Sequence, residues 1–319
     1  MRISDYTAAT DPGRKRRRNE DAYVVKPPLF AVADGMGGPR AGEVASGLAA
    51  AAVKASEAAG GGEEQVVTLI QSANRSVYER SSEDASVSGM GTTMTVAVVD
   101  GRGVAIGHVG DSRAYLARGG TLEQLTEDHS LVSELVRAGK LSPEEAVNHP
   151  QRSVITRALG TDPDVDVDAF TVAPEEGDIF LICSDGLSTM VGDEAIAQVL
   201  GDHRGNLDDA AKELIRLANR AGGEDNITVV AFELSDAPED VEETRPMPAV
   251  SESEPDIEDT LTEADRVPAI DTMVVPPAEA AAAGLQPEPE PPKRRSWWLL
   301  LVLLVVVLVA AAVAWYLLR

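Results

Sequence analysis

The chain has 319 residues and is strongly acidic, with a formal net charge of −25. Binding to nucleic acid depends on clustered Lys and Arg side chains that release counterions, so this charge argues against a nucleic-acid partner. The one cysteine, Cys183, lies within the apolar run IFLIC. An internal disulfide is therefore excluded, and the thiol is expected to be buried and inert.

Strand-like and helical segments alternate unevenly over residues 1–235, which predict a single globular part. Residues 22–25 and 29–33 predict a hairpin with two prolines at its turn, and two Ala-rich helices follow at 40–59 and 64–81. The remaining expected elements are strands within 91–101 and 104–120, helices at 130–140 and 142–149, a strand at 178–183, helices near 192–201 and 206–221, and a strand at 226–234. This order is not a regular βαβ alternation and predicts an α+β fold, with helices covering antiparallel sheets. Ser142 and Glu145 have capping-box spacing at the start of one short helix.

Composition changes after residue 235. Residues 234–292 hold 16 of the 53 acidic residues and 11 of the 19 prolines, with few large apolar residues, so a disordered linker is predicted at 236–295. From Trp297 to Leu318 there are 22 residues without a charge, which as a helix would span roughly 33 Å. A transmembrane helix is therefore expected at 296–319. The three basic residues 293–295 before it predict a tail anchor in the cell inner membrane, with the globular part in the cytoplasm.

Acidic residues stand repeatedly at the edges of the apolar runs of the globular part. Asp34 ends one such run and Asp185 ends another, each followed by a glycine. A single Asp-Gly is ordinary turn chemistry, but a buried carboxylate is costly unless something pairs with it. Several carboxylates at one edge of a sandwich would repel one another unless cations were present. The residues concerned are Glu20, Asp21, Asp34, Asp111, Asp185 and Asp225.

Oxygen ligands, with no cysteine cluster and only four scattered histidines, suit Mg²⁺ or Mn²⁺ rather than Zn²⁺. Two such ions can share a carboxylate and a water, lower the pKa of that water and clamp a phosphoryl oxygen for in-line attack. On this hypothesis Asp34 is the bridging ligand, and Gly35 lets the backbone carbonyl approach the metal.

The sequence resembles the bacterial metal-dependent Ser/Thr protein phosphatases of type 2C, the PPM family. The likeness runs in the family's order through RKRRRNEDA, VADGMGG, GTTMTV, VGDSRAY, LTEDHSLV, HPQRSVITRALG, CSDGLS and EDNITVV, and covers nearly all of residues 1–235. The resemblance implies a four-layer αββα sandwich of two antiparallel sheets flanked by helix pairs. It also implies a centre of two Mn²⁺ or Mg²⁺ ions at one edge.

The resemblance implies a role for each residue that matches a motif. Asp34 matches the ligand shared by both ions and Gly35 the backbone ligand, while Asp185 and Asp225 match the remaining ligands. The residues that match those holding metal-bound waters are Glu20 and Asp21. Arg16 falls at the position of the phosphate-binding arginine, whose guanidinium can grip two phosphate oxygens at once.

Bacterial members often bind a third ion. Asp111 fits a ligand of that ion, with Asp185 shared and Ser153 a further candidate from residues 136–158, which resemble the family's mobile flap. Met36 stands where some members place a histidine that protonates the leaving alkoxide. A thioether cannot donate a proton, so the resemblance does not supply the proton donor.

Three hypotheses for function remain. The first is an enzyme that hydrolyses phosphoserine and phosphothreonine in cytoplasmic or membrane-kinase proteins by in-line attack of a metal-bound water, opposing Ser/Thr kinases. The second is a phosphoprotein-binding module on the same fold with weak turnover, and the third is a dedicated phosphatase for one regulatory phosphoserine protein. All three of Asp34, Asp185 and Asp225 are present, which favours catalysis. The expected partners are phosphorylated proteins, foremost transmembrane Ser/Thr kinases and their substrates.

Overall fold

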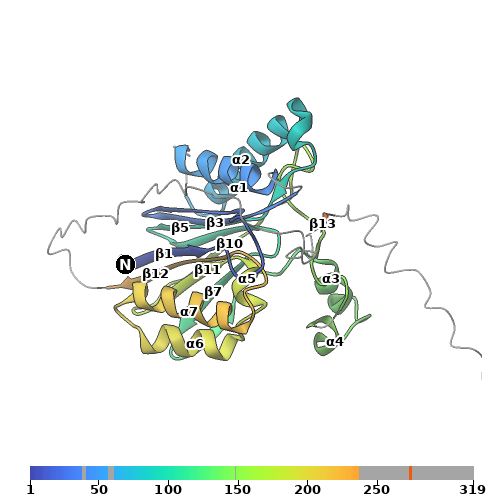
Figure 1. Cartoon of the computed structure of the whole chain (residues 1–319). Helices are drawn as coiled ribbons and strands as arrows, with labels where there is room; N and C mark the ends of the chain where they lie inside the picture. The colour runs from blue at the N-terminus through green and yellow to red at the C-terminus, as the bar shows by residue number, and fades with distance from the viewer. Residues whose placement is uncertain (38–40, 57–60, 148, 237–272, 275–319) are drawn as a thin grey trace, which may run out of the picture. The chain divides into compact units, whose positions relative to one another are not determined.

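The computed structural model describes residues 1–37, 41–56, 61–147, 149–236 and 273–274 (Figure 1). The chain divides into two compact units, Met1–Ala280 and Ala281–Arg319, and every described residue belongs to the first. Among the described residues, no helix is both long and apolar enough to cross a membrane. The predicted membrane span at 296–319 and nearly all of the predicted linker lie outside the described residues.

Two antiparallel sheets lie face to face at the centre of this unit (Figure 1). The first sheet has the strand order β1 (Arg2–Asp11), β12 (Ile227–Ser235), β11 (Ile179–Cys183), β7 (Arg113–Arg118) and β8 (Thr121–Gln124). The second sheet has the order β10 (Asp168–Val172), β6 (Gly103–Val109), β5 (Met94–Asp100), β3 (Leu29–Met36) and β2 (Asp21–Lys26), and β4 (Gly91–Thr92) pairs with β3.

A pair of helices covers the outer face of each sheet (Figure 1). The second sheet is covered by α1 (Ala41–Ala55) and α2 (Glu63–Glu83), and the first by α6 (Asp193–Asp202) and α7 (Leu207–Ala221). The result is an α+β sandwich with two antiparallel sheets and flanking helices, as the sequence predicted. The shorter elements are the 3₁₀ turn η1 (Ala85–Val87), α3 (Leu131–Arg137), α4 (Pro143–Val147), β9 (Val154–Ile155), α5 (Asp185–Ser188) and β13 (Met273–Val274).

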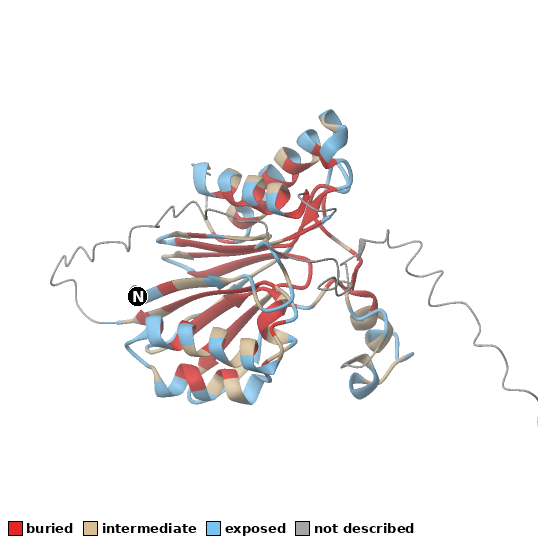
Figure 2. Ribbon diagram, viewed as in Figure 1, coloured by how far each residue is buried: buried red, intermediate tan, exposed pale blue. Residues whose placement is uncertain are grey.

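The core has three layers because the central strands bury side chains on both faces (Figure 2). Between the sheets, the ring of Phe232 stacks on Phe30 at 4.3 Å and on Phe180 at 5.1 Å between centroids. On β3, Phe30 and Val32 face the other sheet, whereas Leu29, Ala31 and Ala33 face the helices. Burial on both faces explains why such strands read as continuous apolar runs in the sequence.

Helix starts follow the local capping signals. The predicted capping box at α4 is present, with Ser142 N–H donating to Glu145 Oε2 at 2.9 Å and Glu145 N–H donating to Ser142 Oγ at 3.3 Å. At α3, Ser130 Oγ accepts from Ser133 N–H at 3.3 Å. These bonds satisfy N–H groups that have no partner within the helix.

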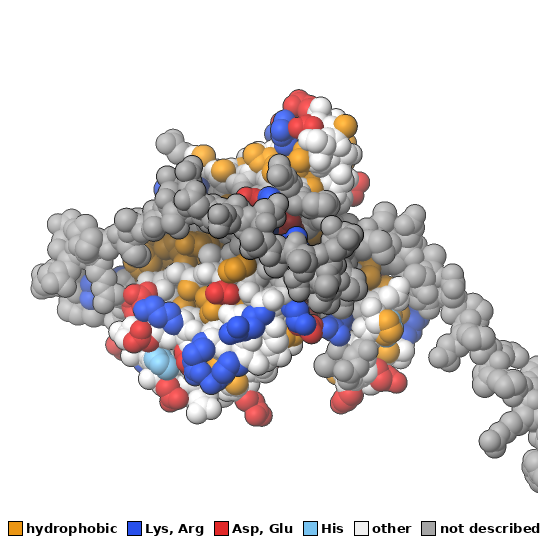
Figure 3. Space-filling model, viewed as in Figure 1, with side chains coloured by type: hydrophobic (Ala, Val, Ile, Leu, Met, Phe, Trp, Pro, Cys, Tyr) orange, Lys and Arg blue, Asp and Glu red, His pale blue; other side chains and the backbone are white. Residues whose placement is uncertain are grey.

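Cations on α7 are balanced by carboxylates of the same helix. The exposed Arg216 and Arg220 both pair with Glu213, and Lys212 pairs with Asp209 at 3.5 Å. Figure 3 shows Lys and Arg side chains beside Asp and Glu side chains over this part of the molecule. This helix therefore carries mixed charge rather than a purely basic surface.

Candidate metal centre

Strand pairing gathers the predicted acidic residues at one edge of the sandwich. Asp21 begins β2 and lies directly opposite Asp34, near the end of β3, in the antiparallel register. Asp185 follows β11 at the start of α5, and Asp225 precedes β12, the strand beside β11. The end of one antiparallel strand lies next to the start of its neighbour, so residues distant in sequence come together there.

Asp111 reaches the same region by a different route. The sequence predicted strands within 104–120, and the structure places the two strands of this range, β6 and β7, in different sheets. The connection therefore crosses from one sheet to the other, and Asp111 lies at the crossing. Asp111 is buried, with 8 % of the residue exposed.

Hydroxyl groups hold the carboxylate of Asp21. Ser184 Oγ donates to Asp21 Oδ2 at 2.8 Å and Thr228 Oγ1 donates to the same oxygen at 2.6 Å. The other oxygen, Asp21 Oδ1, is buried without a hydrogen-bond partner, and Asp185 Oδ1 is in the same condition. Two buried carboxylate oxygens without partners are costly unless a ligand completes them.

Backbone contacts fix the turn that carries Asp34 and Gly35. Thr93 N–H and Thr92 Oγ1–H both donate to Asp34 O, at 2.9 and 2.8 Å. Gly35 N–H donates to Glu20 O at 3.1 Å, and a Cβ at Gly35 would overlap the carbonyl oxygens of Gly42 and Glu20. Only glycine therefore allows the backbone to pass this close to β2 and α1.

The carboxylates of the acidic cluster are buried and repel one another. Burial, followed by repulsion from Asp21, Asp185, Asp225 and Asp111, raises the pKa of Asp34 well above its usual value. Burial, followed by repulsion from Asp111, Asp225 and Asp21, also raises the pKa of Asp185 well above its usual value, although Arg16 acts to lower it. Burial also raises the pKa of Asp21 to about 6 and that of Asp111 to about 7. In each case burial of the charged form is the largest cause of the raised pKa.

The residues of the centre fit divalent cations bound through oxygen. The donors are carboxylates and a backbone carbonyl, two of the buried oxygens have no protein partner, and the charges repel one another. As the side chains stand, no group of three or more His, Cys, Asp and Glu residues in the described part of the chain has the geometry to hold an ion. In the same region, Asp225 Oδ2 accepts from Arg16 Nη2 at 2.8 Å. An ion that took Asp225 as a ligand, as the sequence predicts, would have to replace this ion pair.

Arg16 lies at the centre, where the sequence predicted it, but pairs with a carboxylate. Burial disfavours the charge of its guanidinium, yet Asp225, with Asp34 and Glu20, outweighs this and raises the pKa of Arg16. The side chain of Arg16 is 20 % exposed, so part of it still contacts solvent. Glu20 is fixed through its backbone, since its N–H donates to Asn226 Oδ1 at 2.7 Å.

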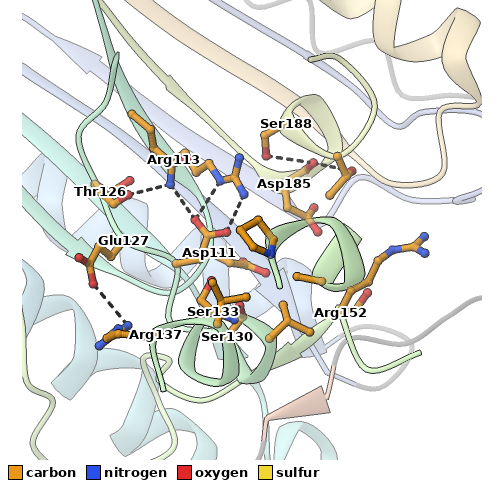
Figure 4. A pocket seen from close by; sticks show the side chains of 18 of the residues that line it. Asp111, Arg113, Thr126, Glu127, Ser130, Ser133, Arg137, Arg152, Asp185 and Ser188 are labelled. Atoms are coloured by element: carbon orange, nitrogen blue, oxygen red, sulfur yellow. Dashed lines mark hydrogen bonds and ion pairs between the residues drawn. The ribbon is translucent and has the colours of Figure 1, made fainter. Parts of the chain in front are cut away.

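A pocket of about 890 Å³ opens beside the centre and is lined by both Asp111 and Asp185. Figure 4 shows these two carboxylates within the same pocket, with Arg152 across from Asp185. The guanidinium of Arg113, which also lines the pocket, pairs with Asp128 at 2.7 Å. Ser153, the third-ion candidate, also lines the pocket. The structure thus brings the three predicted residues to one cavity.

Several residues that position the acids were not predicted from the sequence. Asn226 contacts three backbone groups. Besides accepting from Glu20 N–H, it donates from its amide nitrogen to Pro12 O at 3.0 Å and to Arg18 O at 2.8 Å. The other residues of this kind are Ser184, Thr228, Thr92 and Thr93. Ser184, Asn226 and Thr228 stand within three residues of a predicted acid in the chain, whereas Thr92 and Thr93 do not. A polar residue in either position has no pattern that separates it from an ordinary loop residue.

Stability without metal is expected to fall as the pH rises through neutrality. A carboxyl group whose pKa is raised by folding binds its proton more tightly in the folded chain, so stability is present at low pH and is lost as pH rises through the folded pKa. For Asp21 and Asp111 this range runs from the ordinary value of 3.8 to about 6 and about 7. In EDTA the Tm should be at least about 3 °C lower at pH 8 than at pH 6.5, which corresponds to roughly 1 kcal/mol.

Mn²⁺ is the control for this pH experiment. Burial lowers the pKa of His108 to about 3, so this histidine favours folding as the pH rises toward 6.5 and opposes the carboxyl effect there. The difference in Tm between Mn²⁺ and EDTA at one pH cancels the histidine contribution, and it should grow between pH 6.5 and pH 8. A difference that stays constant or shrinks over this range would contradict the electrostatic account of the cluster.

Comparison with known proteins agrees with this geometry. Residues 16–227 match the family model described as protein phosphatase 2C. The serine/threonine phosphatase stp of Listeria welshimeri is 44 % identical over 236 residues, which cover 70 % of this chain and 93 % of that protein. The serine/threonine protein phosphatase PstP of Mycobacterium tuberculosis is 40 % identical over 270 residues, covering 83 % of this chain and 52 % of that protein.

A solved structure shows the same fold with metal bound. The catalytic domain of the serine/threonine protein phosphatase PstP in complex with two manganese ions superposes with a TM-score of 0.65 and 38 % identity. The match covers 73 % of this chain and 98 % of that structure. The matched family model, the identity to bacterial serine/threonine phosphatases and the acidic centre at the sandwich edge lead to one conclusion: this chain belongs to the protein phosphatase 2C family.

Proposed function

We propose that this protein hydrolyses phosphoserine and phosphothreonine in other proteins, with two Mn²⁺ or Mg²⁺ ions held at the acidic centre. The observation that carries the proposal is the convergence of Asp21, Asp34, Asp111 and Asp185 at one buried edge, where their charges repel and two oxygens lack partners. Such a site is unfavourable as a purely structural element. Hydrolysis that uses divalent cations would explain why these carboxylates are gathered at one edge.

The residues proposed to hold the two ions are Asp34, the carbonyl of Gly35, Asp185 and Asp225. Asp111, Asp185 and Ser153 are proposed for a third ion, because all three line one pocket. Bound divalent cations lower the pKa of water and neutralise charge on a phosphoryl oxygen. The hydroxyls of Ser184 and Thr228 keep the carboxylate of Asp21 in one orientation, in which it can hold a water in the shell with Glu20.

Arg16 is proposed to bind the phosphate group of the substrate. Its guanidinium pairs with Asp225 at the acidic centre. An ion that took Asp225 as a ligand would free the guanidinium of Arg16 from this ion pair. A planar guanidinium can then donate two hydrogen bonds to two phosphate oxygens. Met36 cannot take part in proton transfer, because a thioether carries no transferable proton. Its side chain instead packs against Ile155 and Ala158.

Phosphate release from a phosphothreonine peptide by the purified full-length chain tests the proposal. Release is expected with Mn²⁺ and should stop when EDTA is in excess, then return when Mn²⁺ is added again. A folded chain that releases no phosphate with Mn²⁺ or Mg²⁺ from either phosphothreonine or phosphoserine would contradict the proposed function. It would favour the phosphoprotein-binding hypothesis.

We also propose that the chain is anchored in the cell inner membrane by residues 296–319, with the phosphatase domain in the cytoplasm. The support is the run of 22 uncharged residues with three basic residues before it. Tethering raises the effective concentration of the domain near other membrane proteins, so transmembrane Ser/Thr kinases and their substrates are the proposed partners.

Deleting residues 296–319 separates anchoring from catalysis. The deleted chain is expected to release phosphate from a soluble peptide at the wild-type rate. In cells it should dephosphorylate a membrane-embedded Ser/Thr kinase several-fold more slowly than the full-length chain. Equal rates on the membrane kinase would contradict the proposed role of the anchor.

A further inference from the structure

The short strand β9 has two edges, and the described residues before 237 form strand pairing with only one of them. On the first edge, Ile155 forms an antiparallel bridge with Ser130, and Thr156 N–H donates to His129 O at 2.9 Å. Successive residues of a strand direct their N–H groups to opposite edges. The N–H and C=O of Ile155 therefore face the second edge.

Side-chain packing holds β9 firmly in place. Val154 packs with Leu131 and Leu135 at α3, and Ile155 packs with Met36, two residues after Asp34 in the chain. Ile155 is only 2 % exposed, so its backbone N–H and C=O need partners. A rigid strand with one unpaired edge is a template for an extended segment.

A segment of the same chain lies along that second edge. Met273 and Val274, which form β13, pair in parallel with Val154 and Ile155. This is the one parallel pairing among the described strands, since both sheets are antiparallel. No sequence pattern in the predicted linker led us to expect a strand there.

The composition around β13 fits an edge-docking segment. Within residues 237–292, the triplet 273–275 (MVV) is the only place where three large apolar residues follow one another. β-branched residues favour extended backbone. Pro276 and Pro277 come directly afterwards and cannot donate to a ladder, so they limit the length of the pairing.

We propose that the open edge of β9 is a docking surface for an extended apolar segment, and that its occupant is the segment of this same chain that contains Met273–Val274. The segment binds by adding a strand, so backbone hydrogen bonds hold it. It attaches the region after β12 to the end of the flap segment (residues 136–158), next to the pocket that Ser153 lines. The docking does not depend on the proposed phosphatase activity.

The register distinguishes two neighbouring positions of β13. In a parallel pair of strands, when one residue directs its N–H and C=O toward the partner strand, the residue opposite it directs its own N–H and C=O away. Val274 lies opposite Ile155, whose groups face β13, so the N–H of Val274 points away from β9 and that of Met273 points toward it. Proline at 273 removes a donor of the ladder, and proline at 274 removes none.

Amide hydrogen exchange of Ile155 in the purified full-length chain tests the proposal. We expect Met273→Pro to speed exchange of this amide about fivefold or more, as the loss of one net backbone hydrogen bond would. The matched variant Val274→Pro should stay within about twofold of the wild type. A synthetic peptide of residues 268–277 should restore slow exchange in Met273→Pro, and the same peptide with proline in place of Met273 should not. Exchange in β5 serves as the control for folding.

Three results would overturn the docking. The first is equal exchange at Ile155 in the wild type and Met273→Pro, and the second is equal acceleration by both proline variants. The third is protection that rises with protein concentration, which would assign the edge to a second copy of the chain. Because exchange is measured without substrate, a chain that fails as a phosphatase can still pass or fail this test.

Discussion

Replacing Asp34 by Asn is expected to lower Mn²⁺-dependent phosphate release by roughly 10²-fold or more, because the variant loses the proposed shared ligand of both ions. The substitution keeps the size of the side chain and leaves the backbone contacts of the turn intact, since Thr92 and Thr93 bind Asp34 O rather than the carboxylate. The loss should appear in kcat at saturating substrate. It should persist at Mn²⁺ concentrations that saturate the wild type.

The same variant should gain stability when no metal is present. Asp34 is buried among carboxylates that raise its pKa, so a neutral amide removes repulsion from the folded chain. The Tm of Asp34→Asn in EDTA at pH 8 should therefore equal or exceed that of the wild type. Asp164→Asn, on an exposed loop, is the matched control and should change neither activity nor Tm. Wild-type activity in Asp34→Asn would remove Asp34 from the proposed metal ligands.

Replacing Phe232 by Ala is expected to destabilise the domain by about 3–5 kcal/mol. Phe232 is fully buried and stacks on Phe30 of the other sheet and on Phe180 of the neighbouring strand. Its loss leaves a cavity between the sheets that both rings would have to fill. Denaturant unfolding monitored by circular dichroism, with the metal concentration held constant, measures the change.

Tyr23→Ala is the matched control for Phe232→Ala, because this aromatic side chain lies on β2 and is 37 % exposed. Its effect should be smaller than about 1 kcal/mol. If both variants cost the same, the layer between the sheets would not be the main packing layer. Activity of Phe232→Ala, measured well below its unfolding transition, should remain, since the ring does not line the pocket.

Local patterns in the sequence account for most of the elements. The β2–β3 hairpin, the helices α1, α2, α6 and α7, and strands β11 and β12 all lie where the apolar runs and turn residues predicted them. β1 and β10 were not predicted. Most of the residues of each are exposed or half-buried, so neither forms a clear apolar run, and each is added to its sheet by pairing with a distant strand.

The sequence by itself determined which residues carry chemistry: oxygen ligands at the ends of apolar runs, in the order of a known family. Their arrangement was decided by tertiary structure. The register that sets Asp21 opposite Asp34, the crossing between sheets at Asp111 and the ion pair of Arg16 with Asp225 join segments up to 209 residues apart. The pairing of β13 with β9 is of the same kind. Such contacts depend on which strand edges remain available after the core has packed, and no local window of sequence contains that information.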